Sequence, residues 1–291
     1  MTSVKRLDGA FGVAVEGVDL SQGVEADTMH LLTQTLYENR IIVIRNQRLS
    51  QDAYLQFGRQ WGSPIPHVLD HMRMPGYPEL MAIGNTEEKD RKDDIRNAAA
   101  LWHTDQSYED VPASATMLYA IKVPQVGGET QFCDMVTAYD DLDEATKTRL
   151  DGLDLAHKYG RGNRRADELV VSPLINEEQD QRVPPVYHPL VLPHPITGRK
   201  GLYALGHGAY GVKGMPEREA EDLIAELKEH VLQEKYIYRH KYAVGDIAVW
   251  DTFQTMHSAV PIEVATSEAD ARLLWRISIR GKPRIYEAAV V

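Results

Sequence analysis

The spacing of hydrophobic residues predicts a mixture of helices and strands in the first part of the chain. Apolar residues at helical spacing alternate there with short runs of β-branched residues, which favour buried strands. This pattern predicts strands at residues 11–18 and 40–45 and helices at residues 26–38 and 51–61. Ser50 can cap the second of these helices, and Gly62 can end it.

The pattern farther along the chain is mostly that of short strands. Two helical stretches and one irregular, charged stretch interrupt it. Strands are predicted at residues 79–83, 115–123, 129–132, 187–192, 201–205, 236–241, 246–250 and 272–280 and around His257, helices at 135–150 and 216–234, and a long loop at 161–185. Many short strands with helices outside them are typical of a double-stranded β-helix, or jelly roll, which can enclose a ligand cavity.

Nothing along the chain marks a boundary between two domains. There is no internal repeat, no low-complexity tract and no linker between the mixed N-terminal part and the β-rich remainder. A chain of 291 residues can form one large domain. We therefore expect a single domain over residues 1–291 that is mainly β with flanking helices, in which residues 1–100 form a mixed α/β part packed on the jelly roll.

The balance of charges bears on the partners of the protein. Lys and Arg number 32 and Asp and Glu number 43, so the net charge is −11. An acidic surface disfavours nucleic acid and anionic membranes as partners, because both favour basic patches. Any anionic ligand must then be held by local positive charge inside a pocket.

Cysteine usage and the N-terminus favour a cytoplasmic protein. Cys133 is the only cysteine, so no intrachain disulfide can form, which fits a reducing compartment. We expect its side chain to be a small buried hydrophobe rather than a reactive thiol. The N-terminus lacks the apolar run of a signal peptide, and no apolar stretch approaches the ~20 residues that a membrane span requires.

The most informative motif is Trp102-His103-Thr104-Asp105, taken together with the distant His257. Residues i and i+2 of an extended strand point to the same face, so His103 and Asp105 can aim at one point. Two histidines and one carboxylate on one face form the facial triad of non-haem Fe(II) oxygenases. That triad leaves three coordination positions open, which a bidentate 2-oxo acid and O2 would fill. The short motif alone also fits a strand-end histidine that is hydrogen-bonded to an aspartate.

Residues 272–280 form the second informative segment. One face of the predicted strand is apolar, and the other carries Arg272, Arg276 and Arg280. Such a face can lie in solvent, as the polar side of a surface strand. The segment follows His257 closely, so we expect it to run beside the strand of that histidine and to turn its arginines into the cavity. An arginine there offers a bidentate fork to a carboxylate or sulfonate.

A series of motifs runs along nearly the whole chain. They are Gly17-Val18-Asp19-Leu20, Arg45-Asn46-Gln47, Phe57 with Trp61-Gly62, Trp102-His103-Thr104-Asp105, Gly127-Gly128-Glu129-Thr130, His188-Pro189-Leu190-Val191, residues 194–200, Gly245-Asp246, Trp250-Asp251, Met256-His257 and Arg272 with Arg276. In order and spacing the series resembles the TauD/TfdA family of Fe(II)/2-oxoglutarate-dependent dioxygenases. The resemblance implies Fe(II) as the metal, 2-oxoglutarate as the cosubstrate and O2 as the oxidant.

The resemblance also implies roles for single residues at the metal and the cosubstrate. His103, Asp105 and His257 resemble the iron ligands. Thr130 resembles the threonine whose hydroxyl meets the distal carboxylate of 2-oxoglutarate, and Arg272 resembles the arginine that pairs with that carboxylate.

Two further residues resemble those that bind the substrate. Arg276 resembles the arginine that binds the acidic group of the substrate, and His67 resembles a histidine that helps to hold it; the alternative for His67 is an exposed loop histidine. The chain departs from the family pattern at Thr252, where Asn is usual. Residues 261–271 are also a longer stretch than usual, so the assignment of the cosubstrate role to Arg272 rather than Arg276 is less firmly set by the spacing. Residues 97–101 are apolar before the histidine motif, so we expect a bulky, less polar substrate that still carries an acidic group.

The implied reaction is hydroxylation of a C–H bond in a small, partly apolar organic acid, with release of succinate and CO2. Two other functions stay open on the residues alone. A metal-dependent hydrolase can use the same two histidines and one aspartate around Zn2+, although it has no need of Thr130 or the arginine strand. A non-catalytic jelly-roll binding protein is the third possibility. The resemblance further implies a homo-oligomer, and we expect the remaining histidines, among them His207, to be structural.

Overall fold

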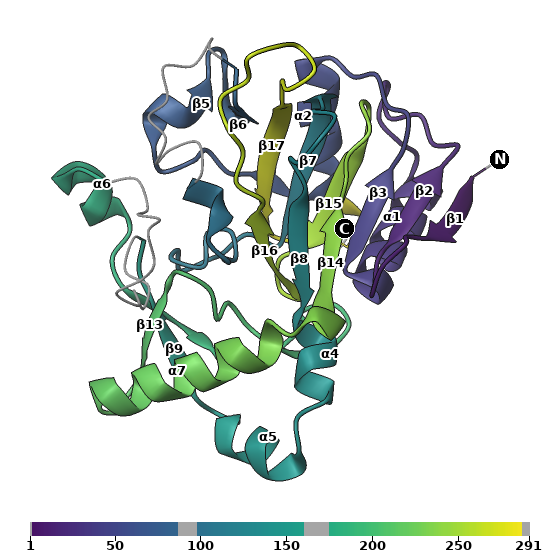
Figure 1. The fold of residues 1–291 in the computed structure, drawn as a ribbon. Helices are drawn as coiled ribbons and strands as arrows, with labels where there is room; N and C mark the ends of the chain where they lie inside the picture. The colour runs from purple at the N-terminus through teal and green to yellow at the C-terminus, as the bar shows by residue number, and fades with distance from the viewer. Residues whose placement is uncertain (1, 87–97, 160–174, 287–291) are drawn as a thin grey trace, which may run out of the picture.

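The computed structural model describes residues 2–86, 98–159 and 175–286 of the chain. Its largest unit is a sheet of nine strands (Figure 1). The order across this sheet is β1 (Ser3–Arg6), β2 (Val13–Glu16), β3 (Ile41–Ile44), β15 (Ile247–Asp251), β7 (Ala115–Lys122), β17 (Leu273–Arg280), β6 (Tyr77–Gly84) and β5 (Arg73–Met74), and β4 (Ser63–Pro64) pairs with β17 off this row. Because β3 from the first part of the chain lies between β2 and the late strand β15, distant segments build one sheet.

Three smaller sheets complete the β structure. Their strands are β14 (Ile237–His240), β8 (Thr130–Asp134) and β16 (Thr255–Ala259) in the first, β10 (Val186–Pro189), β9 (Asp154–His157) and β13 (Ala209–Val212) in the second, and β11 (Val191–Pro193) with β12 (Lys200–Leu202) in the third. The β14–β8–β16 sheet packs against the large sheet through a shared apolar core, in which Phe132 and Tyr238 meet Leu118, Trp250 and Leu274. Two sheets that face each other across one core are the arrangement of the expected jelly roll, which is confirmed.

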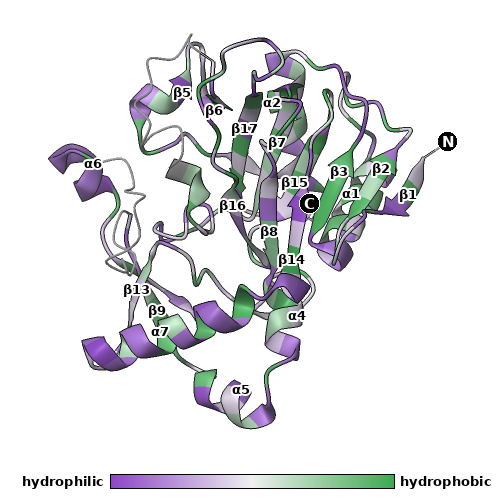
Figure 2. Ribbon diagram, in the orientation of Figure 1, coloured by the Kyte–Doolittle hydropathy of each residue, from purple (hydrophilic) through white to green (hydrophobic). Residues whose placement is uncertain are grey.

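Helices cover the outer faces of the sheets. They are α1 (Ala26–Asn39), α2 (Gln51–Trp61), α4 (Met135–Asp140), α5 (Glu144–Leu150), α6 (Glu177–Arg182) and α7 (Glu217–Val231), with short 3-10 turns at Asp70–Met72, Ala98–Ala100, Glu234–Tyr236 and Arg284–Tyr286. Leu36 of α1 and Phe57 of α2 are fully buried in the same core as Ile42 and Ile277 of the large sheet. The strands β2 and β3 under α1 have hydrophobic colours along their length (Figure 2).

Several local predictions are confirmed in detail. The Ser50 side chain accepts a hydrogen bond from the Ala53 N–H at the start of α2, and Gly62 follows its last residue. Gly62 has φ +144°, and a Cβ there would lie 2.5 Å from the Arg280 carbonyl oxygen. Glycine is therefore needed at this position, where the chain leaving α2 passes close to the end of β17. Cys133 is buried, as expected for a small hydrophobe.

Four local predictions are wrong. The helix expected over 135–150 is two helices, because the Asp143 side chain accepts from the Thr146 N–H and so starts α5 as a separate element. The strand at 187–192 is likewise two short strands, β10 and β11. The loop expected over 161–185 contains α6, which Asn176 begins with a capping box, while residues 160–174 lie outside the described part. The strand β17 pairs with β4, β6 and β7 and not with β16, which belongs to the other sheet.

No helix in the described ranges is long and apolar enough to cross a membrane.

Candidate active site

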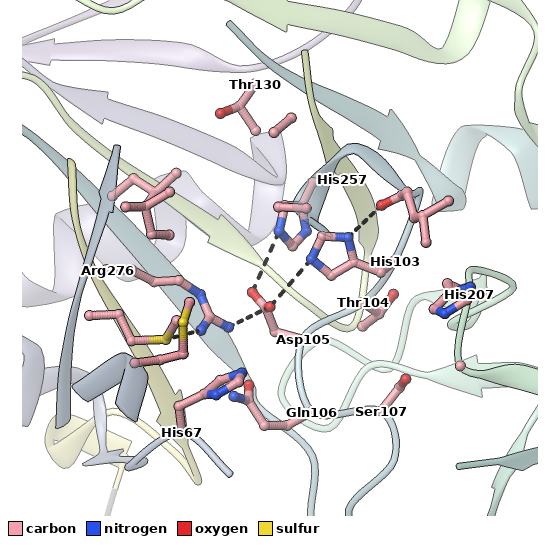
Figure 3. Close-up of a pocket in the computed structure, with 18 of the residues that line it drawn as sticks. His67, His103, Thr104, Asp105, Gln106, Ser107, Thr130, His207, His257 and Arg276 are labelled. Carbon is pink, nitrogen blue, oxygen red and sulfur yellow. Dashed lines mark hydrogen bonds and ion pairs between the residues drawn. The ribbon is translucent and has the colours of Figure 1, made fainter. Parts of the chain in front are cut away.

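A cavity of about 180 Å³ opens between the two facing sheets. Its wall includes His103, Asp105 and His257 together with Thr130 and Arg276 (Figure 3). These residues come from four separate segments of the chain, because His103 and Asp105 lie two residues apart. The fold thus brings the separate motifs of the sequence to one concave surface, which is where a binding site is expected.

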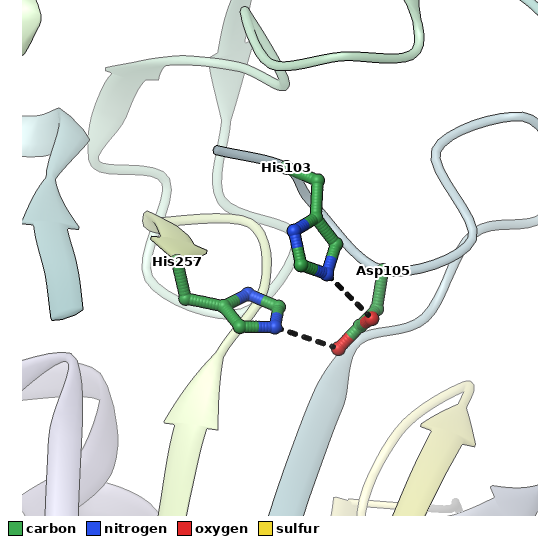
Figure 4. A group of neighbouring side chains, drawn as sticks. All are labelled: His103, Asp105 and His257. Atoms are coloured by element: carbon green, nitrogen blue, oxygen red, sulfur yellow. Dashed lines mark ion pairs between the residues drawn. The ribbon is translucent and has the colours of Figure 1, made fainter. Parts of the chain in front are cut away.

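The two histidines and the aspartate form one group (Figure 4). Ligand atoms of His103, Asp105 and His257 all lie within 4.8 Å of one another. The Nε2 atom of His103 lies 3.7 Å from Asp105 Oδ1, and Nε2 of His257 lies 3.7 Å from Asp105 Oδ2. The carboxylate therefore faces both imidazoles, one with each oxygen.

The backbone that presents this group differs from the expected strand. His103 forms an isolated antiparallel bridge with His257, and Asp105 lies in a turn that continues with Gln106 at φ +51°. His103 and Asp105 do face one point, as predicted, but the alternation of side chains along a strand is not the cause. The turn after Thr104 directs the carboxylate towards the two imidazoles.

Hydrogen bonds and burial fix the protonation of the two histidines. Nδ1 of His103 lies 2.6 Å from the Leu101 carbonyl, so it carries the proton, and the Nε2 lone pair faces Asp105. Burial lowers the pKa of His103, and burial together with the nearby His103 ring lowers the pKa of His257 to about 3. Both imidazoles are therefore neutral near pH 7, which is the form that binds a metal.

The Asp105 carboxyl is ionised. Burial acts to raise its pKa, but Arg276, followed by His257 and His103, outweighs burial, so the pKa lies well below its usual range. Asp105 Oδ2 is buried and has no hydrogen-bond partner among the residues that the structure describes. A cation between this oxygen and the two Nε2 atoms would satisfy it, so the three residues fit a divalent metal. Among the described residues no fourth His, Cys, Asp or Glu joins the group.

Arg276 lies directly beside the aspartate. Its NH2 group donates to Asp105 Oδ1 at 2.5 Å, and the side chain is buried (Figure 3). Arg272 on the same strand side is also buried. The alternative of a solvent-facing polar strand is therefore wrong for these two arginines, which line the cavity. The third arginine, Arg280, does not line the cavity and pairs with Glu109.

Arg272 occupies a different part of the cavity from Arg276. Its Nε donates to the Gly128 carbonyl at 3.1 Å, and no hydrogen-bond partner of its two terminal nitrogens occurs in the described ranges. Gly128 has φ +80°, and a Cβ there would lie 3.2 Å from the Arg272 side chain and 2.7 Å from Pro124, so glycine is needed for this approach. Thr130, two residues on, lines the same cavity.

The long segment before β17 is tied down at its two ends by Asn85. The Asn85 amide donates to the Glu263 and Asp270 carbonyls, and its Oδ1 accepts from the Arg272 N–H at 2.7 Å. The extra length of residues 261–271 therefore leaves the start of β17 in a defined position. This arrangement favours Arg272 as the arginine near Thr130 and Arg276 as the arginine near the metal group.

His67 lines the cavity and is half-buried, so the alternative of an exposed loop histidine is wrong. Its Nδ1 accepts from the Leu69 N–H at 3.1 Å. Burial, followed by the charge of Arg276, lowers the pKa of His67 to about 3. The imidazole is therefore neutral near pH 7.

Sequence reasoning did not single out several residues of the cavity wall. They include Tyr108 and Tyr159, whose rings meet edge to face with centroids 5.0 Å apart. Lys158 also lines the cavity and forms an ion pair with Asp180 of α6. His207, expected to be structural, also lines the cavity (Figure 3). None of these residues belongs to a spaced motif. The one signal in the sequence is that Tyr108 follows Asp105 by three residues.

Comparison with known proteins extends the likeness over the whole chain. The family described as "Taurine catabolism dioxygenase TauD, TfdA family" matches residues 3–278. The chain is 34% identical over 257 residues to the alpha-ketoglutarate-dependent 2,4-dichlorophenoxyacetate dioxygenase of Cupriavidus pinatubonensis, with 85% of this chain and 88% of the relative covered. It is 32% identical over 287 residues to the (S)-phenoxypropionate/alpha-ketoglutarate-dioxygenase of Sphingobium herbicidovorans, with 95% and 94% covered.

The solved structure of AAD-2 with Mn(II) and N-oxalylglycine is similar, with a TM-score of 0.79 at 26% identity and with 97% of each chain covered. Residues 3–278, matched by the family, include every candidate site residue described above.

Proposed function

Because the chain belongs to the TauD, TfdA family of dioxygenases, we propose that the cavity holds a metal, a cosubstrate and a small organic acid side by side. The protein is an Fe(II)- and 2-oxoglutarate-dependent dioxygenase that acts on an organic acid. One oxygen atom of O2 enters a C–H bond of the substrate, and the other enters succinate as 2-oxoglutarate loses CO2. The observation that carries the proposal is the convergence of His103, Asp105 and His257 on the wall of a cavity that also contains two arginines.

We assign His103, Asp105 and His257 as the ligands of Fe(II). Two neutral imidazoles and one ionised carboxylate are the donor set of a facial triad, and their mutual distances suit a single ion. Ferrous iron bound there would supply the activation of O2. The protein contributes the ligand geometry: the Leu101 carbonyl fixes the His103 tautomer, and Arg276 holds one oxygen of Asp105.

We assign Thr130 and Arg272 to the distal carboxylate of 2-oxoglutarate. The Arg272 guanidinium is buried and offers its terminal nitrogens to the cavity, which suits bidentate recognition of a carboxylate. The Thr130 hydroxyl lines the same part of the cavity. A buried arginine that lacks a protein carboxylate partner in the described ranges favours an anionic ligand, because burial of a lone positive charge is costly.

We assign Arg276 and His67 to the acidic group of the substrate. A guanidinium has five N–H donors, so the hydrogen bond to Asp105 leaves others for a second anion. The neutral His67 imidazole can donate one further hydrogen bond beside this charge. Both residues line the cavity on the Asp105 side.

The rest of the substrate is expected to be apolar. The cavity wall also carries apolar and aromatic side chains, among them Leu69, Met72, Met81, Ile83, Leu101, Tyr108 and Tyr159. Two relatives are named for phenoxyalkanoic acids, whose aromatic ring and carboxylate match such a wall and an arginine. We therefore propose aryloxyalkanoic acids as the first substrates to test.

A succinate-release assay tests this function. Purified protein with Fe(II), ascorbate and 2-oxoglutarate is screened against phenoxyalkanoic acids, sulfate esters, sulfonates and amino-acid derivatives. We expect substrate-dependent succinate release that needs O2. Turnover that continues without O2 and 2-oxoglutarate would contradict the proposal and favour a metal-dependent hydrolase, and binding without turnover of any acid would favour a binding protein.

We further propose that residues 1–291 form a single dioxygenase domain, that the enzyme works in the cytoplasm as a homo-oligomer, and that it binds neither nucleic acid nor membranes. The net charge of −11 and the lone buried Cys133 support this setting. Size-exclusion chromatography with light scattering tests the oligomeric state.

A further inference from the structure

Tyr242 contacts a residue of the proposed cosubstrate site without lining the cavity itself. It lies between β14 and β15, its side chain is buried, and its hydroxyl donates to Thr130 Oγ1 at 3.0 Å. Thr130 lines the cavity, whereas Tyr242 is not among the cavity-lining residues. Among the described residues its hydroxyl donates to Thr130, so its directed effect on a ligand in the cavity passes through the threonine. The charge of Arg272 is the other cavity group that acts on the phenol.

The direction of this hydrogen bond determines where the threonine proton points. A threonine hydroxyl has one proton and two acceptor sites. Tyr242 occupies one acceptor site of Thr130, and no acceptor for the Thr130 proton occurs among the described residues. The proton is thus left for a ligand in the cavity. The acceptor that fits there is anionic, because the Arg272 guanidinium lines the same part of the cavity.

The surroundings of Tyr242 hold its ring in place. The ring meets the His240 ring edge to face, with centroids 4.4 Å apart and an angle of 81° between the planes. His240 is itself buried and bonded through Nδ1 to the Tyr238 hydroxyl at 2.9 Å. Burial raises the pKa of Tyr242 to about 12, so the phenol keeps its proton at neutral pH and remains a donor.

We propose that Tyr242 is a positioning residue for the cosubstrate: its hydroxyl orients the Thr130 hydroxyl so that the threonine proton meets the distal carboxylate of 2-oxoglutarate. This inference rests on the proposed function, namely on Thr130 and Arg272 as the site of that carboxylate. A carboxylate bound there receives one directed O–H donor in addition to the guanidinium. The threonine gives up no orientational freedom on binding, because Tyr242 has already fixed it.

Affinity for 2-oxoglutarate, measured by anaerobic calorimetry on the Fe(II)-loaded enzyme, tests the proposal. We expect Tyr242→Phe to raise the Kd by about fivefold to tenfold, the effect of losing one hydrogen bond between neutral groups that orients the Thr130 donor. Thr130→Ala is expected to raise the Kd by at least as much. The double variant is expected to come within about twofold of Thr130→Ala alone, since the hydrogen bond that the phenol donates among the described residues goes to the threonine.

A matched control is Tyr236→Phe. Tyr236 is also buried, but its hydroxyl donates to Asp141 at 2.8 Å, away from the cavity. Its removal should leave the Kd unchanged. A second probe is 2-oxopentanoate, which lacks the distal carboxylate: Tyr242→Phe should leave its affinity at the wild-type value.

The outcomes separate this inference from the proposed function. If Thr130→Ala raises the Kd and Tyr242→Phe does not, the role of Tyr242 is refuted and the cosubstrate site stands. If Thr130→Ala leaves the Kd unchanged, the assignment of Thr130 fails, and the inference fails with it. An equal loss of affinity for both 2-oxo acids in Tyr242→Phe would show a merely structural role and overturn the proposal.

The wild-type protein offers a test that needs no variant. A crystal structure with Mn(II) and N-oxalylglycine should have Thr130 Oγ1 within about 3 Å of the distal carboxylate while Tyr242 still donates to Thr130. A Thr130 hydroxyl that points away from the ligand, or a Tyr242 hydroxyl that bonds the ligand directly, would contradict the proposal.

Discussion

His103 and His257 are joined through their backbones: the N–H of each donates to the carbonyl of the other at 2.9 Å. Their imidazole centroids lie 4.1 Å apart as a result. A reciprocal pair of this kind fixes two residues from distant segments as firmly as two neighbours in a sheet. The two histidines of the metal group are therefore positioned by the folded jelly roll, while the turn after Thr104 positions Asp105.

The first prediction concerns the metal ligands. Both His103→Ala and Asp105→Ala should lower metal affinity and turnover by more than about 100-fold, because each removes one of three donors. Asp105→Ala should also lower the free energy of unfolding, since it leaves Arg276 buried beside no carboxylate. Mn(II) binding by calorimetry and succinate release check this. His30→Ala, at an exposed position on α1, is the control, and full activity in either ligand variant would refute the assignment.

The second prediction separates the two buried arginines. Arg272→Ala should raise the KM for 2-oxoglutarate by at least about 30-fold, as expected for a lost buried charge pair, and change the KM for the organic acid little. Arg276→Ala should have the opposite pattern. Steady-state kinetics with each reactant varied in turn give the answer. A normal 2-oxoglutarate requirement in Arg272→Ala, with a raised one in Arg276→Ala, would exchange the two roles.

The third prediction concerns Asn85, which binds both ends of residues 261–271. Asn85→Ala leaves two carbonyls and the Arg272 N–H without their partner, so the free energy of unfolding should fall by about 2–4 kcal/mol. The Kd for 2-oxoglutarate should rise as well, because Arg272 loses its fixed position. Asn39→Ala is the matched control: its amide bonds only the Thr35 carbonyl in α1. Urea unfolding and anaerobic calorimetry measure the two effects, and an unchanged Kd would show that Arg272 holds its place without Asn85.

The fold was predictable from the sequence where interactions between residues close together in the chain determine the local structure. The cap of α2 by Ser50 needs only residues within one helical turn, and the helix begins where the sequence indicates. The pairing of β17 was not predictable in the same way. Alternation shows which side of a strand is apolar, but the choice of β7 and β6 as its neighbours depends on contacts with distant segments.

The same distinction applies to the site. The motif around His103 and the later His257 predicted which residues meet, although the turn at Asp105 could not be derived from it. The hydrogen bond from Arg276 to Asp105 and that from Tyr242 to Thr130 each join a strand to a distant loop, and no spacing in the sequence indicates either. Such partners are found only when the packing of the sheets is known.

The fourth prediction concerns stability in acid. His157 in β9 is completely buried, and within the described ranges neither of its ring nitrogens has a hydrogen-bond partner. Burial, followed by the nearby His188, lowers the pKa of His157 from 6.5 to about 3. Between these two pH values the unfolded chain binds a proton at this residue that the folded protein does not, so stability falls as the pH falls from about 6.5 towards 3.

Replacement of this histidine should therefore protect the fold in acid. In His157→Phe the proton uptake by the unfolded chain is absent, and no hydrogen bond is lost in the folded protein. Relative to wild type, the variant should gain about 2 kcal/mol of unfolding free energy between pH 7.5 and pH 5. Urea unfolding at the two pH values measures this gain, with the exposed His30→Phe as the control. A difference between variant and wild type that is the same at both pH values would mean that His157 already carries its proton in the folded protein.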